Sequence, residues 1–87
     1  MHAVVVRVSI NDPEAATKAL QEEVVPRASQ APGFVAGYWT REGNNGLSMI
    51  VFESEDGARA ASEMIPNGMP ESVTLDGVDV REVVAHA

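Results

Sequence analysis

The stretch FVAGYWTREGNNGLSMIVFE, residues 34–53, decides the fold of this chain. Both of its ends are rich in aromatic and β-branched residues, and its middle, Gly43-Asn44-Asn45-Gly46, is typical of a turn. The pattern predicts two strands, Phe34–Glu42 and Gly46–Glu53, joined as a hairpin by a four-residue loop. An isolated hairpin is marginally stable, so the flanking segments must supply elements that cover it.

The segment before the hairpin pairs a strand with a helix. Alternating apolar residues predict a strand at His2–Ile10. Asp12 and Pro13 then mark the start of a helix that runs to about Gln30, since aspartate caps free backbone donors and proline suits the first helical position. Pro26 lies inside this helix, and we expect it to kink the helix or to split off its last turn.

The segment after the hairpin repeats that pairing in reverse order. Ser54 is a helix cap, followed by a helix from Glu55 to about Ile65. A last strand is predicted from about Ser72 to Ala85, and Asp76-Gly77 interrupts it as a bulge or a short turn.

The resulting element order is β-α-β-β-α-β, the ferredoxin-like arrangement of two split βαβ units. We therefore predict an α+β fold in which a four-stranded antiparallel sheet carries two helices on one face. A chain of 87 residues leaves room for one domain, residues 1–87.

The predicted strands are apolar on both faces, although helices cover one face alone. In the first strand Val4, Val6, Val8 and Ile10 lie opposite Ala3 and Val5. Leaving the second face in water would expose several hundred Å² of apolar surface. We therefore expect a homodimer formed through the sheet face opposite the helices. The residues expected in that interface are Leu47, Met49, Val51 and Val35.

Two short motifs carry a resemblance to a known family. Ala31-Pro32-Gly33-Phe34 leads into a strand, and the next strand ends in Val51-Phe52-Glu53-Ser54. With the order and length of the elements, this resembles the antibiotic biosynthesis monooxygenase-like proteins of the dimeric α/β-barrel superfamily. The resemblance implies homodimers whose sheets close into a barrel, with a pocket in each subunit between sheet and helices. Members of the superfamily include cofactor-independent monooxygenases and haem-degrading enzymes.

Haem degradation is disfavoured by the residues at the family's functional positions. For haem degradation the resemblance implies an asparagine on the first strand, a tryptophan near the end of the third strand and a haem-ligating histidine on the second helix. This chain offers Val6 and Phe52 at the first two positions, and its histidines, His2 and His86, lie outside the second helix. Without an axial ligand the iron has no protein anchor, so no cofactor is expected.

The helices carry many alanines, so they either lie close to the sheet and leave no cavity, or lie at the normal distance and leave a pocket. Where a ligand site exists, it is expected between the sheet and the helices. Its expected walls are Val6, Val8, Tyr38, Ile50, Phe52, Ala61 and Met64. Tyr38 is the candidate catalytic residue, since it alone in this set carries an acidic proton. Tyr38 and Trp39 are adjacent on one strand and point to opposite faces, so either could line a pocket for a flat aromatic compound.

Charge and composition exclude several other classes of protein. Thirteen acidic against six basic residues give a net charge of −7, which disfavours nucleic acid and anionic membranes as partners. The absence of cysteine excludes thiolate metal sites, and no motif supports another metal site. We read His2 and His86 as solvated ends. Arg7 is expected to form an ion pair with Asp79, with Glu82 or with an acidic residue of the second subunit, and the alternative is a site for a substrate carboxylate. No apolar run can span a membrane, and a cytoplasmic location is expected.

Two functions remain open at this stage. The first is a cofactor-free monooxygenase acting on a small aromatic or phenolic compound. The second is a non-catalytic dimeric protein that binds a small ligand or has a structural role. The apolar floor expected for the pocket weakens acid–base catalysis, because a proton-transferring group must lie within hydrogen-bond reach of the substrate.

Overall fold

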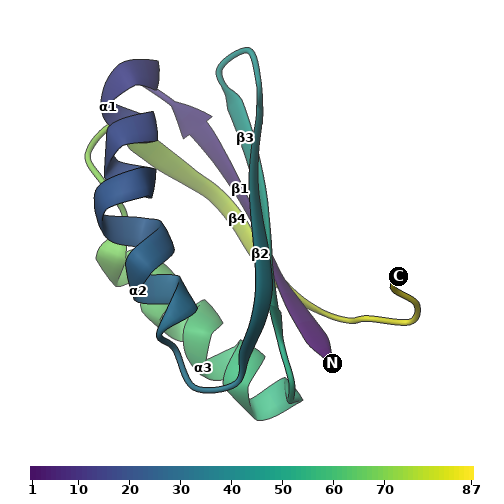
Figure 1. Cartoon of the computed structure of the whole chain (residues 1–87). Helices are drawn as coiled ribbons and strands as arrows, with labels where there is room; N and C mark the ends of the chain where they lie inside the picture. The colour runs from purple at the N-terminus through teal and green to yellow at the C-terminus, as the bar shows by residue number, and fades with distance from the viewer.

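The chain folds as a four-stranded antiparallel sheet with its helices on one face, as predicted (Figure 1). The computed structural model describes residues 1–87. The strand order is β2-β3-β1-β4, the ferredoxin-like topology. In chain order the elements are β1 (His2–Ile10), α1 (Pro13–Ala19), a π-helical turn η1 (Leu20–Val24), α2 (Val25–Ser29), β2 (Phe34–Glu42), β3 (Asn45–Phe52), α3 (Glu55–Met64), a 3₁₀ turn η2 (Ile65–Gly68) and β4 (Val73–Glu82).

Both predicted helix starts are confirmed by side-chain caps. The Asp12 carboxylate accepts a hydrogen bond from the backbone N–H of Ala15 at 3.2 Å. The Ser54 hydroxyl accepts one from the backbone N–H of Gly57 at 3.1 Å. Each bond satisfies a donor that the first helical turn leaves free, so these short polar side chains fix where α1 and α3 begin.

Pro26 does perturb the first helix, through a widened turn. The backbone N–H of Val25 donates to the carbonyl of Leu20, five residues earlier, so η1 is π-helical. Proline has no N–H to give to the carbonyl four residues before it, and its ring crowds that carbonyl. The wider turn relieves this crowding and divides the helix into α1, η1 and α2. No helix in the structure combines the length and the apolar character needed to cross a membrane.

The hairpin between β2 and β3 is tighter than predicted. Glu42 pairs with Asn45, so Gly43 and Asn44 form a two-residue loop in place of the expected four-residue loop. Gly43 has φ 59°, which a type II′ turn requires at its first central position. The pairing thus extends β3 by one residue at its start, and the sheet is correspondingly longer at this end.

The apolar core is small and lies between the sheet and α3. Its buried cluster consists of Val4, Val6, Ile50, Phe52 and Ala58. Phe34 packs edge-on against Phe52, with ring centroids 6.3 Å apart. Nine residues of the chain are buried, and α1, η1 and α2 together contribute only Ala16. The first helical layer is therefore not packed tightly onto the sheet.

The last strand contains the predicted irregularity. Arg7 pairs with Gly77 and Val8 with Leu75, so Asp76 is an extra residue and forms a bulge. β4 ends at Glu82, before the predicted Ala85. The residues after it extend away from the sheet as a tail (Figure 1).

Candidate functional site

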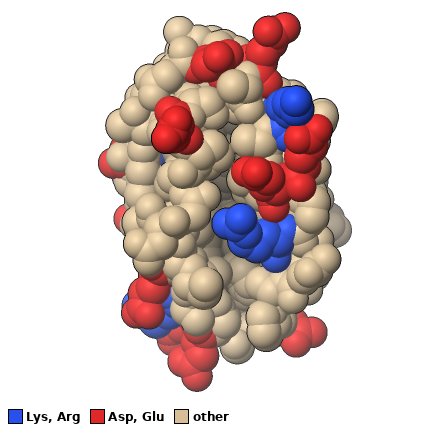
Figure 2. All heavy atoms as spheres, turned by 90° about the vertical axis from the view of Figure 1, so that its left-hand side faces the viewer, with Lys and Arg blue, Asp and Glu red and all other residues tan.

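A groove of about 760 Å³ lies between the α1–η1–α2 layer and the sheet. It continues beside α3 and η2, and its volume is in the range of small-molecule sites. Figure 2 views the helical side of the molecule, where the surface is hollowed between the helices and basic atoms lie at the border of the hollow. Alanines from both helical layers, among them Ala16, Ala28 and Ala61, line the groove. Their small side chains leave space that larger residues would fill.

Six of the seven expected pocket residues line this groove. They are Val6, Val8, Ile50, Phe52, Ala61 and Met64. The β1 and β3 residues form its floor, because they share the helix-facing side of the sheet. Ala61 and Met64 enter from α3. Of the 29 lining residues 17 are hydrophobic, so the groove suits a ligand that is mainly apolar.

Tyr38 does not line the groove, and its expected placement is wrong. Its side chain is 66% exposed, and it pairs with Met49 on the opposite face of the sheet. The cause is a bulge at Val35: Phe34 pairs with Phe52, whereas Ala36 pairs with Val51, so Val35 is an extra residue. A bulge shifts the alternation of side chains by one position, which reverses the faces of every later residue in β2.

Trp39 takes the position expected for Tyr38. It lines the groove from β2 and packs beside the core. A Cβ at Gly37 would lie 2.6 Å from the indole Cη2, so the ring lies over this glycine. Glycine inside a strand often marks such a close approach, and Gly37 was the signal in the sequence that could have placed Trp39 on this face.

The groove has few polar residues, and its charged residues are all positive. Arg27 and Arg41 are the only ionisable residues in its lining, which includes no Asp, Glu, His, Lys or Tyr. The uncharged polar residues there include Ser48, Thr40 and Gln21. Because the lining has no carboxylate, imidazole, amine or phenol side chain, the groove of one chain has no general base.

The sheet face opposite the helices is divided into an apolar and a polar half. The apolar half lies on β2 and β3. Its large exposed side chains are Val35, Tyr38, Leu47 and Met49, which are 44–66% exposed.

The polar half lies on β1 and β4, where Arg7 pairs with Asp79 as predicted. The guanidinium donates a hydrogen bond to the carboxylate at 2.8 Å, and Arg81 lies 3.7 Å from the same oxygen. The hydrogen bond from Arg7 lowers the pKa of Asp79 below its ordinary value of 3.8.

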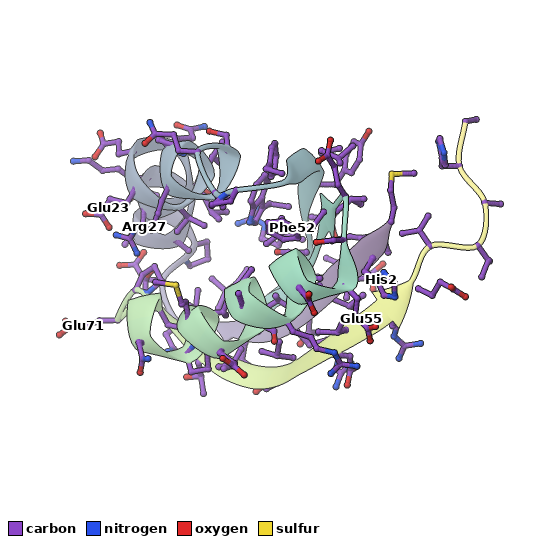
Figure 3. The ribbon with its side chains drawn as sticks, turned by 90° about the horizontal axis from the view of Figure 1, so that it is seen from below. His2, Glu23, Arg27, Phe52, Glu55 and Glu71 are labelled. Atoms are coloured by element: carbon purple, nitrogen blue, oxygen red, sulfur yellow. The ribbon has the colours of Figure 1, made fainter.

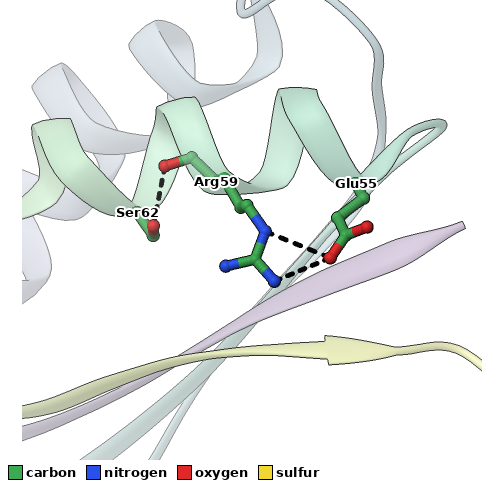
Figure 4. A network of polar contacts seen from close by, with 3 residues as sticks. All are labelled: Glu55, Arg59 and Ser62. Carbon is green, nitrogen blue, oxygen red and sulfur yellow. Dashed lines mark hydrogen bonds and ion pairs between the residues drawn. The ribbon is translucent and has the colours of Figure 1, made fainter.

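A second ion pair lies on α3, away from the groove lining. Arg59 donates two hydrogen bonds to one oxygen of Glu55, at 3.1 and 2.7 Å, and Ser62 donates to the Arg59 carbonyl (Figure 4). The hydrogen bond and the charge of Arg59 lower the pKa of Glu55, and the more distant His2 adds to this effect. No group of three or more His, Asp and Glu side chains is arranged to hold a metal ion.

This chain is similar along its whole length to a solved structure, the crystal structure of a dimeric ferredoxin-like protein from an uncultured marine organism. The TM-score is 0.66 at 13% sequence identity, and the match covers 100% of this chain and 98% of the other. No family model matches the chain. No curated protein matches it either. At this identity the likeness supports the ferredoxin-like fold alone.

Proposed function

We propose that this protein binds a small, mainly apolar molecule in the groove between the α1–η1–α2 layer and the sheet. The observation that carries the proposal is the groove itself, which is apolar, about 760 Å³ in volume and formed by backbone elements of one chain. The aromatic face of Trp39 offers a stacking surface within it. A ligand with an aromatic ring would bury its apolar surface against this indole and the valines of β1.

A homodimer is the second part of the proposal. The apolar half of the open sheet face would pack against the same half of a second copy, which is an isologous contact. Tyr38 is then an interface residue, a role that its apolar ring and polar tip suit. The similar solved structure is described as dimeric, which supports this arrangement. The two sheets would close into the barrel that the family resemblance implies.

A cofactor-free monooxygenase activity on a phenolic compound remains the catalytic alternative. Such a reaction needs the substrate to lose a proton, and the groove of one chain supplies no base for this step. With Tyr38 on the other face, the candidate catalytic residue from the sequence is also missing. Binding without catalysis is therefore the function that the geometry supports best.

Ligand binding is tested with neutral aromatic alcohols and phenols, because Trp39 is the only tryptophan in the chain and lies in the groove. A bound compound should change the Trp39 emission and raise the Tm, since it binds the folded state alone. Oxygen uptake in the same solutions tests the catalytic alternative. If no compound changes either the emission or the Tm, the groove is not a binding site.

The dimer is tested by light scattering of the purified protein at micromolar concentration. We expect twice the mass of the 9.2 kDa chain. The double substitution Leu47→Glu with Met49→Glu should give monomers, because it places charges in the apolar half of the open face. The matched control is Met64→Glu on α3, which removes an exposed methionine from the helical side and should stay dimeric. A monomeric unmodified protein contradicts this part of the proposal.

A further inference from the structure

The charges of the groove differ in sign from the charge of the whole chain. The chain carries thirteen acidic and six basic residues, yet none of the acidic residues lines the groove and two arginines do. Neither arginine forms an ion pair or a side-chain hydrogen bond within the protein. Unpaired arginines beside an apolar surface favour an apolar ligand with a negative group.

Arg27 is better placed than Arg41 to bind a negative group of a ligand in the groove. It extends from α2 toward η2, because a Cβ at Gly68 would lie 2.8 Å from its Nη1. The guanidinium therefore spans the opening between the two helical elements that border the groove. Arg41 lies at the hairpin end of β2, where it lines an adjoining depression together with Glu42 and Asp76.

Glutamates on two neighbouring segments do not form an ion pair with Arg27. Figure 3 shows Glu23, one helical turn earlier, and Glu71, after η2, on the same side of the molecule as Arg27. No ion pair within 4.0 Å joins Arg27 to either of them. The guanidinium of Arg27 occupies the space that a side chain at Gly68 would take, and its N–H groups can still donate to a ligand.

We infer that the ligand of the groove is a small organic anion, whose carboxylate is bound by Arg27 while its apolar body lies against Trp39. This inference rests on the proposed binding function and specifies the chemical class of the ligand. A planar guanidinium matches a carboxylate with two parallel N–H donors, which fixes the orientation of the ligand as well as its charge. The apolar floor then accommodates the rest of the molecule.

The test compares two compounds with the same body, phenylbutyrate and the neutral phenylbutanol. Neither absorbs where tryptophan can be excited selectively, so the emission of Trp39 reports binding of both. We expect phenylbutyrate to bind about tenfold more tightly than phenylbutanol, as for one charge-assisted contact at a partly exposed site. Arg27→Gln should lower the affinity for phenylbutyrate about tenfold and the affinity for phenylbutanol by less, so that the preference is lost. A cooperative urea unfolding transition shows that the variant is folded.

Three further variants separate charge from geometry. Lys18→Gln is the matched control, because it removes the same charge from α1 outside the groove and should keep the preference. Arg27→Lys should keep part of the preference for phenylbutyrate, because it retains the charge but not the two parallel N–H donors. Gly68→Ala leaves the charge in place but displaces the guanidinium, and it should reduce the preference.

The possible outcomes distinguish the two proposals. If neither compound changes the Trp39 emission in any variant, the proposed binding function fails. If both compounds bind equally, or if Arg27→Gln leaves the preference intact, the binding function stands and the anion inference is overturned. Loss of the preference in Arg41→Gln alone would also overturn it, because the anion would then lie at the hairpin end.

Discussion

The indole of Trp39 lies over Gly37 on the groove side of β2. A Cβ added to Gly37 would come within 2.6 Å of Cη2 and 2.8 Å of Cζ3, distances that no side chain tolerates without moving. The glycine therefore creates the space that holds the indole at the groove wall. The shape of the groove wall therefore depends on glycine at position 37.

Gly37→Ala should displace the indole and alter the groove. We expect a cost in the free energy of unfolding of about 1–3 kcal/mol, the usual range for added volume at a packed position. The emission of Trp39 should shift to longer wavelength as the ring becomes more exposed. Urea unfolding and emission spectra measure the two effects. Gly57→Ala is the control, because it adds the same methyl group away from Trp39 and should leave the spectrum unchanged.

Ala61→Leu tests whether the groove is empty space. Ala61 enters the groove from α3, so the larger side chain should narrow it and weaken the binding of aromatic alcohols. Where a cavity is present, the change should alter the free energy of unfolding by less than about 1 kcal/mol. Titrations followed by Trp39 emission and urea unfolding check both expectations.

The control for Ala61→Leu is Ala60→Leu, since Ala60 is exposed on the same helix and does not line the groove. It should bind aromatic alcohols like the unmodified protein. A loss of several kcal/mol in Ala61→Leu would mean that the space is already packed, and the binding proposal would lose its site.

Much of the fold follows from local signals in the sequence. Asp12 and Ser54 begin the helices because short polar side chains cap free backbone donors, and both caps are present. Strand β1 has the predicted bounds, since its apolar alternation runs unbroken from His2 to Ile10. The groove floor was predictable for the same reason, as Val6 and Val8 share one face of a regular strand.

The wall formed by β2 was not predictable from the same reasoning. Alternation assigns faces only while the pairing is regular, and the bulge at Val35 is a property of two strands together. Tyr38 and Trp39 suit either face by chemistry alone. The arginine at the groove opening was also missed, because the contact of Arg27 with Gly68 joins segments far apart in the sequence.

Pro26→Ala should convert the π-helical turn into regular α-helix. The substitution supplies the missing backbone donor and removes the crowding by the proline ring. We expect a gain in stability smaller than the about 3 kcal/mol that proline costs inside a regular helix, because η1 already relieves part of the strain. The gain is measured by urea unfolding, and amide hydrogen exchange over residues 20–25 should slow. Pro13→Ala, at the first helical position, should show no such gain.

The Arg7–Asp79 ion pair should make the stability of the protein depend on pH. Asp79 has a pKa below its ordinary value of 3.8 because Arg7 hydrogen-bonds to its ionised form. A carboxyl group with a lowered folded-state pKa contributes stability above its unfolded pKa, and that contribution is lost as the pH falls through the folded value. Both side chains are substantially exposed, so the contribution is small and decreases further with added salt.

Gly77→Ala isolates this effect, because the guanidinium of Arg7 lies across Gly77. A Cβ at this position would contact Nη2 and would lie 3.0 Å from Cζ, so the guanidinium of Arg7 must shift, and we expect the shift to weaken its hydrogen bond to Asp79. We expect the pKa of Asp79, followed by NMR titration of its carboxyl carbon, to rise toward 3.8. The pKa of Glu55 serves as the internal control, since its partner Arg59 lies on α3. At neutral pH the variant should therefore have a lower urea midpoint than the unmodified protein, in part because the Arg7–Asp79 interaction is weakened. In acid, where Asp79 is protonated in both proteins, this part of the difference should disappear. An Asp79 pKa that stays equally low in Arg7→Gln would show that Arg7 is not its cause.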